Sequence, residues 1–147
     1  MSIAIAYIPE GYTPEQKQIM IKGTKKACMD GFGVSEDHSF VSIQEIKKEN
    51  MDAQTANMKS LFIYTTFGKT PEGKNIICKG FDEACQEAFG DDKGRTIVII
   101  KEHGNDNAGS NGYLRPFSPG YADYVKMQEK MEAIAKAKAS QQSNSGI

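Results

Sequence analysis

The chain has 147 residues, of which 39% are hydrophobic and 25% are charged, with a net charge of -1 and a pI near 6.1. This balance is typical of one compact domain and excludes a dedicated nucleic-acid binder, which would carry a basic stripe. No apolar run reaches the roughly 18 residues of a membrane span, and no secretory signal is recognisable. Three cysteines without a CxxC pair, and only two histidines, predict no disulfide framework, no metal site and a reducing, cytoplasmic setting.

A shift of 57 residues aligns the chain with itself. Residues 13–33 (TPEQKQIMIKGTKKACMDGFG) and 70–90 (TPEGKNIICKGFDEACQEAFG) are identical at 11 of 21 positions without a gap. The same shift pairs three further residues: Tyr7 with Tyr64, Gly11 with Gly68, and Glu45 with Glu102. The repeat predicts a duplicated unit of about 57 residues, with one copy over 2–46 and the other over 59–103.

Each copy has the pattern of a strand, a helix and a second strand. The first strands start near Ile3 and Leu61, and the helices follow a Thr-Pro-Glu sequence that is typical of a helix start. Such units make right-handed parallel crossovers. We therefore predict an α/β (α+β) fold with a four-stranded mixed sheet and both helices on one face. The recurrent Gly23 and Gly80 predict a close approach of each helix to the sheet. The other sheet face would be apolar and uncovered, which predicts an oligomer.

The remaining residues predict a C-terminal extension of a single domain that covers residues 1–139. Residues 104–120 are rich in Gly, Asn and Pro and predict turns. Residues 121–139 predict a helix with Tyr124, Met127, Met131 and Ile134 along one stripe. Residues 140–147 (SQQSNSGI) predict a disordered tail.

The opening residues 2–17, SIAIAYIPEGYTPEQK, resemble the start of 4-oxalocrotonate tautomerase and its relatives. Together with the repeat and the length, they resemble the two-unit members of the tautomerase superfamily, such as cis-3-chloroacrylic acid dehalogenase and malonate semialdehyde decarboxylase. The resemblance implies a β-α-β tautomerase fold and a homotrimer. It also implies an isomerase, or a related lyase or hydratase, that acts on small α-keto, enol or unsaturated carboxylic acids without a metal or organic cofactor.

The residue at the centre of this family is an N-terminal proline, and Ser2 stands in its place here. A small residue after Met1 generally permits removal of the methionine, which frees the α-amine of Ser2. The pKa of an ordinary α-amine is about 7.7–8.0, and burial in an apolar pocket lowers such a value towards that of a useful base. The resemblance thus implies that the Ser2 amine transfers the proton. If Met1 stays, this role is lost and Ser2 only begins the first strand.

The resemblance also implies basic residues that hold the substrate carboxylate. Lys69 takes the place of one such arginine in the turn after the third strand, and Tyr12 stands where single-unit enzymes have another. We expect Lys69 to bind the carboxylate and Tyr12 to line the pocket. Further candidates are Arg95 and Arg115, the only two arginines, and Tyr113 as a donor to an enolate. Each of these three also fits a structural or solvent-exposed role.

Two other pairs in the repeat predict structural roles. Cys28 and Cys85 are equivalent and predict packed core thiols, and Glu45 and Glu102 predict a structural role in the repeat or a subunit contact. Two functions stay open on the sequence. One is an enzyme that uses the Ser2 amine, and the alternative is a non-catalytic, oligomeric binding or scaffold protein of the same fold.

Overall fold

The computed structural model describes residues 1–145. It consists of two compact units, residues 1–103 and the part from Gly104 onward. Among the described residues, no helix combines the length and the apolar character needed to cross a bilayer.

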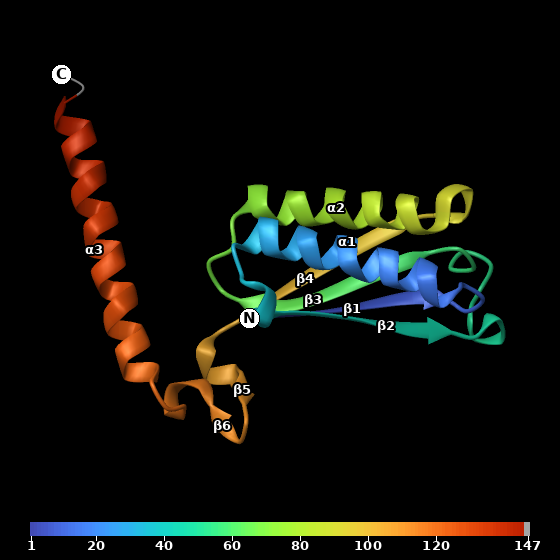
Figure 1. Ribbon diagram of the computed structural model, residues 1–147, viewed down its shortest axis with the longest axis horizontal. Coiled ribbons are helices and arrows are strands. Elements are labelled where there is room, and N and C mark those ends of the chain that lie inside the picture. Colours follow the sequence, from blue (N-terminus) through green and yellow to red (C-terminus); the bar gives the residue numbers. More distant parts are fainter. Residues whose placement is uncertain (146–147) are drawn as a thin grey trace. The chain divides into compact units, whose positions relative to one another are not determined.

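The first unit contains the two β-α-β copies in a single sheet. The first copy comprises β1 (Ser2–Pro9), α1 (Pro14–Phe32) and β2 (Ser39–Ile46), and the second comprises β3 (Lys59–Thr66), α2 (Pro71–Phe89) and β4 (Thr96–His103). The strand order is β2-β1-β3-β4, with each outer strand parallel to its neighbour and with β1 antiparallel to β3. Both helices cover the same face of the sheet (Figure 1). The predicted four-stranded mixed sheet is therefore confirmed.

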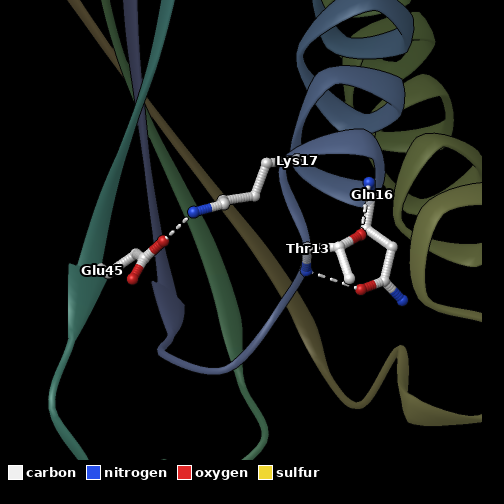
Figure 2. A network of polar contacts seen from close by, with 4 residues as sticks. All are labelled: Thr13, Gln16, Lys17 and Glu45. Atoms are coloured by element: carbon white, nitrogen blue, oxygen red, sulfur yellow. Dashed lines mark hydrogen bonds and ion pairs between the residues drawn. The ribbon is translucent and has the colours of Figure 1, made fainter.

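The repeated threonine is the N-cap residue of both helices. The Thr13 hydroxyl accepts the backbone N–H of Gln16 at 3.2 Å, and the Gln16 side chain accepts the N–H of Thr13 at 2.9 Å, which makes a capping box (Figure 2). In the second copy, the Thr70 hydroxyl accepts the N–H of Gly73 at 3.0 Å. These bonds satisfy helix N–H groups that have no partner within the helix.

The glutamates of the repeat tie each helix to the strand that follows it. Lys17 of α1 forms an ion pair with Glu45 of β2 (Figure 2). In the second copy, the ammonium of Lys74 in α2 lies 3.4 Å from Glu102 Oε1 in β4. Both pairs are partly exposed, so each contributes at most about 1 kcal/mol. Glu45 and Glu102 thus have an equivalent structural role inside their own copies.

The repeated glycines bring the two helices together, whereas the sequence predicted an approach to the sheet. A Cβ atom added to Gly23 would lie 2.7 Å from the Cβ of Ala84, and one added to Gly80 would collide with the Cβ of Ala27. The shift of 57 residues relates Gly23 to Gly80 and Ala27 to Ala84. Each glycine therefore faces the alanine of the other helix, and the prediction of a helix-to-sheet contact is wrong.

The core lies between the helices and the sheet, and the opposite sheet face is uncovered. Fully buried side chains on the helix side include Ala4, Ala6, Leu61, Ile63, Ile77, Phe81, Cys28 and Cys85. This confirms the two cysteines as core thiols. On the other face, Ile3, Phe40, Tyr64 and Ile99 are each 43–49% exposed. Because alternate strand residues point to opposite faces, this second face is a contiguous apolar surface.

The second unit contains a small hairpin and a long helix. Strands β5 (Gly109–Ser110) and β6 (Tyr113–Leu114) pair antiparallel around a turn at Asn111 and Gly112, and α3 spans Tyr121–Ser145. The helix passes the predicted end at residue 139, so the expectation of a disordered tail is wrong for 140–145. Alanines and lysines fill most of residues 133–139, and neither glycine nor proline interrupts residues 121–145. Residues 146–147 lie outside the described part of the chain.

Candidate functional site

A row of polar side chains crosses the sheet at the start of β1. Ser2 pairs in register with Ser39 of β2 and with Thr65 of β3, and Thr65 pairs with Glu102 of β4. Residues paired across strands point to the same face, here the face that the helices cover. Ser2 and Thr65 are fully buried and Ser39 is 1% exposed. Four adjacent strands therefore place three hydroxyls and one carboxylate side by side.

The hydroxyls of this row have unused hydrogen-bonding capacity. Thr65 Oγ1 donates to the carbonyl oxygen of Met1 at 3.2 Å. Within the described structure, Ser2 Oγ and Ser39 Oγ are buried without a hydrogen-bond partner. A buried polar group left unpaired costs about 1–3 kcal/mol, so two neighbouring ones are unusual. They provide donors and acceptors for a ligand atom or an ordered water at the start of β1.

Lys69 supplies a positive charge at the same end of the sheet. Its ammonium lies 3.4 Å from Thr66 Oγ1 and 5.7 Å from the centre of the Phe32 ring. Its backbone N–H donates to Glu102 Oε1 at 3.2 Å, so the carboxylate that pairs with Lys74 also fixes the turn that carries Lys69. In the described residues, no carboxylate lies within ion-pair distance of the Lys69 ammonium. The charge is available for an anionic ligand.

Tyr12 and Arg95 lie at the opposite end of the same unit. Tyr12 follows the end of β1, and its hydroxyl donates to Asp92 Oδ2 at 2.6 Å. The carbonyl of Arg95 accepts the N–H of Lys59, the first residue of β3, at 2.9 Å. Because β1 and β3 are antiparallel, the end of β1 meets the start of β3. The seven steps from Ser2 to Pro9 span roughly 23 Å at 3.3 Å per residue.

The predicted site residues thus fall into three places. Within one chain, Ser2 and Lys69 share one end of the first unit, while Tyr12 and Arg95 share the other. Tyr113 and Arg115 belong to the second unit. There, Tyr113 lies in the hairpin, and the Arg115 guanidinium stacks 4.8 Å from the centre of the Tyr124 ring. A role for Tyr113 and Arg115 at the Ser2 site stays a prediction.

Sequence reasoning missed three residues of the Ser2 end. Ser39 and Thr65 carry no motif, and only the strand register places them beside Ser2. Phe32 ends the helix of the first copy, and its ring lies beneath the Lys69 ammonium. The repeated Phe-Gly at the ends of both helices was the one signal that could have drawn attention to it.

The buried thiols of Cys28 and Cys85 are unreactive at neutral pH. Burial raises the pKa of Cys28 to about 11 and that of Cys85 to about 12. Both therefore stay protonated at neutral pH, and a thiolate, the reactive form of cysteine, is absent from these two positions. Among the described residues, no cluster of His, Cys, Asp or Glu could hold a metal ion.

Comparison with known proteins places this geometry in a known fold. No protein-family model and no curated protein matches the sequence, but solved structures do. Fused 4-OT, solved as a wild-type asymmetric trimer, superposes with a TM-score of 0.69 over 76% of this chain and 94% of that one, at 20% identity. Malonate semialdehyde decarboxylase superposes with a TM-score of 0.66 over 84% and 98%, at 15% identity.

The chain has the tautomerase fold. Fused 4-OT and malonate semialdehyde decarboxylase are members of the tautomerase superfamily, and they confirm the fold that residues 2–17 and the repeat predict. Macrophage migration inhibitory factor of Toxoplasma gondii is also similar, with a TM-score of 0.62 over 76% of this chain and 97% of that one, at 18% identity. In this fold, Ser2 is the first residue of β1.

Proposed function

We propose that this protein acts as a tautomerase on a small α-keto, enol or unsaturated carboxylic acid, with the α-amine of Ser2 as the proton-transfer group. The observation that carries the proposal is the position of Ser2. It lies fully buried at the start of β1, at the same end of the unit as the Lys69 ammonium, for which no carboxylate partner is found in the described residues.

Removal of Met1 would create the reactive group in this setting. The Met1 carbonyl is the acceptor of the Thr65 hydroxyl, so its loss leaves Thr65 Oγ1 next to the new amine. An amine in a buried place holds its proton less tightly than one in water. The neutral amine would take the hydroxyl proton of an enol, and the resulting ammonium would return a proton to the adjacent carbon. Lys69 would hold the carboxylate as a point charge.

The test is the ketonisation of phenylenolpyruvate by protein whose intact mass shows whether Met1 is present. Ser2→Ala is the informative variant, because alanine also permits removal of Met1 and keeps the α-amine while deleting the hydroxyl. We expect activity in processed wild type and in processed Ser2→Ala, and none in protein that keeps Met1 or whose α-amine has been carbamylated. Inactive processed wild type together with an active Ser2→Pro would overturn the proposal and favour a non-catalytic binding protein.

We also propose that the chain assembles as a homotrimer in a reducing, cytoplasmic setting. The apolar sheet face around Ile3, Phe40, Tyr64 and Ile99 supports an assembly that covers it, and fused 4-OT, which has the same fold, is a trimer. Three chains of 16.2 kDa give about 49 kDa. Light scattering coupled to size exclusion should report this mass, and a monomer at micromolar concentration would contradict the assembly.

A further inference from the structure

The end of the first unit opposite Ser2 contains a buried lysine. The side chain of Lys59 is fully buried. Its ammonium donates to Asn57 Oδ1 at 2.6 Å, to the Asn57 carbonyl at 3.3 Å and to the carbonyl of Asp92. It also lies 5.0 Å from the centre of the Tyr12 ring and 5.2 Å from that of Phe89. All three ammonium protons therefore have an oxygen acceptor, and two aromatic rings border the charge.

This lysine occupies the position that the repeat makes equivalent to Ser2. The shift of 57 residues relates Ser2 to Lys59 and Phe32 to Phe89. Both ends of the unit thus have an ammonium next to the last aromatic residue of a helix. At one end the ammonium belongs to Lys69 of the turn, and at the other it belongs to Lys59 of the strand.

The surroundings of Lys59 are fixed by other contacts. The Tyr12 hydroxyl donates to Asp92 Oδ2 at 2.6 Å, and the Tyr12 ring packs 4.2 Å from the Phe89 ring, so the tyrosine is held over the ammonium. Gly94 has a positive φ of 66°, and any Cβ there would collide with the carbonyl of Asn57. The backbone of Gly94 therefore lies close against the carbonyl of Asn57.

We infer that Asn57, Asp92, Tyr12 and Phe89 form a cage for a primary ammonium ion, and that Lys59 is its built-in occupant, which closes this end of the unit to outside ligands. Burial lowers the pKa of Lys59, and the charge of Asp92 opposes that shift. The carbonyl oxygens and rings supply the compensation that a buried cation needs. A lysine that reacts with carbonyl substrates would need an accessible amine, and the Lys59 side chain has no solvent-accessible surface. The inference does not depend on the chemistry proposed for Ser2.

The direct test empties the cage and refills it. Lys59→Ala removes the atoms from Cγ to Nζ, which correspond to n-propylammonium. We expect the melting temperature to fall by about 10 °C or more, and n-propylammonium to restore part of it in a saturable manner. Propan-1-ol, which has the same shape without the charge, should restore none. Lys79→Ala, which removes an exposed lysine side chain, is the matched control and should show neither effect. A folded Lys59→Ala variant that n-propylammonium does not stabilise would overturn the cage.

Chemical labelling of the wild type keeps the inference testable if Lys59→Ala fails to fold. Reductive methylation of the folded protein should modify Lys79 and leave Lys59 unmodified until the chain is denatured. Treatment with pyruvate and cyanoborohydride should likewise leave no adduct on Lys59. A pyruvate adduct on Lys59 in the folded protein would show an open, reactive amine at this end and refute the closed cage.

Discussion

The replacement of Lys69 by alanine tests the carboxylate contact at the Ser2 end. The Lys69 ammonium lies 3.4 Å from the Thr66 hydroxyl and 5.7 Å from the Phe32 ring centre, so it can donate to a substrate carboxylate without first breaking an ion pair. A hydrogen bond to a charged group contributes about 1.5–3 kcal/mol. At about 1.4 kcal/mol for each factor of ten, Lys69→Ala should raise KM for an enol acid by about 10- to 150-fold.

The rate constant should change much less than KM. The carboxylate does not react, so it is held equally in the ground state and in the transition state, and such uniform binding affects KM and leaves kcat nearly constant. Lys69→Arg should keep KM near the wild-type value or lower it, because a guanidinium binds a carboxylate through two hydrogen bonds. Where turnover is too slow to measure, the dissociation constant of phenylpyruvate takes the place of KM.

Lys79→Ala separates a local contact from a general loss of charge. The Lys79 side chain is 76% exposed on α2, and its ammonium lies 3.9 Å from Glu83 Oε1. Lys79→Ala therefore changes the net charge by the same amount as Lys69→Ala but leaves the Ser2 end intact. We expect its KM to stay within about twofold of wild type, since exposed charges are screened. An unchanged KM in Lys69→Ala, or an equal rise in Lys79→Ala, would refute the assignment of Lys69 to the site.

Three predictions concern the core. Gly23→Ala should destabilise the fold by about 1–3 kcal/mol through its contact with Ala84. Adding Ala84→Gly should recover part of this loss in urea unfolding, whereas strictly additive effects would contradict the packing. A thiol reagent at pH 8 should label Cys78 in the native protein, and Cys28 and Cys85 only after unfolding. Because the folded pKa values of these two thiols are raised from 9.0, stability should fall by about 1 kcal/mol per thiol between pH 9 and 10, and a flat profile would argue against their burial.

Much of the fold could be predicted from the repeat. The Thr-Pro-Glu starts, the Phe-Gly ends and the alternating strands each have a local physical cause, and the same causes act twice. The contact partner of a repeated residue has no such local signal. The sequence predicts that Gly23 and Gly80 approach the sheet, yet each faces an alanine of the other helix. In the contact between the helices, each glycine packs against a residue that is not its own repeat equivalent. Aligning the sequence with itself shows which positions are equivalent but not which positions are in contact.

The candidate site was harder to predict for the same geometric reason. Tyr12 and Lys69 were both chosen from the turn after a first strand, and they are 57 residues apart. Repeat-related positions near the strand ends lie at opposite ends of the unit, because β1 and β3 run antiparallel. Tyr12 and Lys69 therefore do not meet in one pocket of one chain. Thr65 does meet Ser2, and only the pairing register of the strands shows it.

The two ends of the unit differ mainly in where their positive charge originates. At the Ser2 end, the strand position holds a short hydroxyl side chain, and Lys69 extends from a turn with one hydroxyl within reach of its ammonium. At the other end, the strand position holds Lys59, whose charge is surrounded by carbonyl oxygens and aromatic rings of its own chain. An ammonium whose donors are satisfied internally gains little from a substrate carboxylate, whereas one with free donors gains a charged hydrogen bond. We therefore propose that the exchange of serine for lysine between equivalent positions directs ligand binding to the Ser2 end.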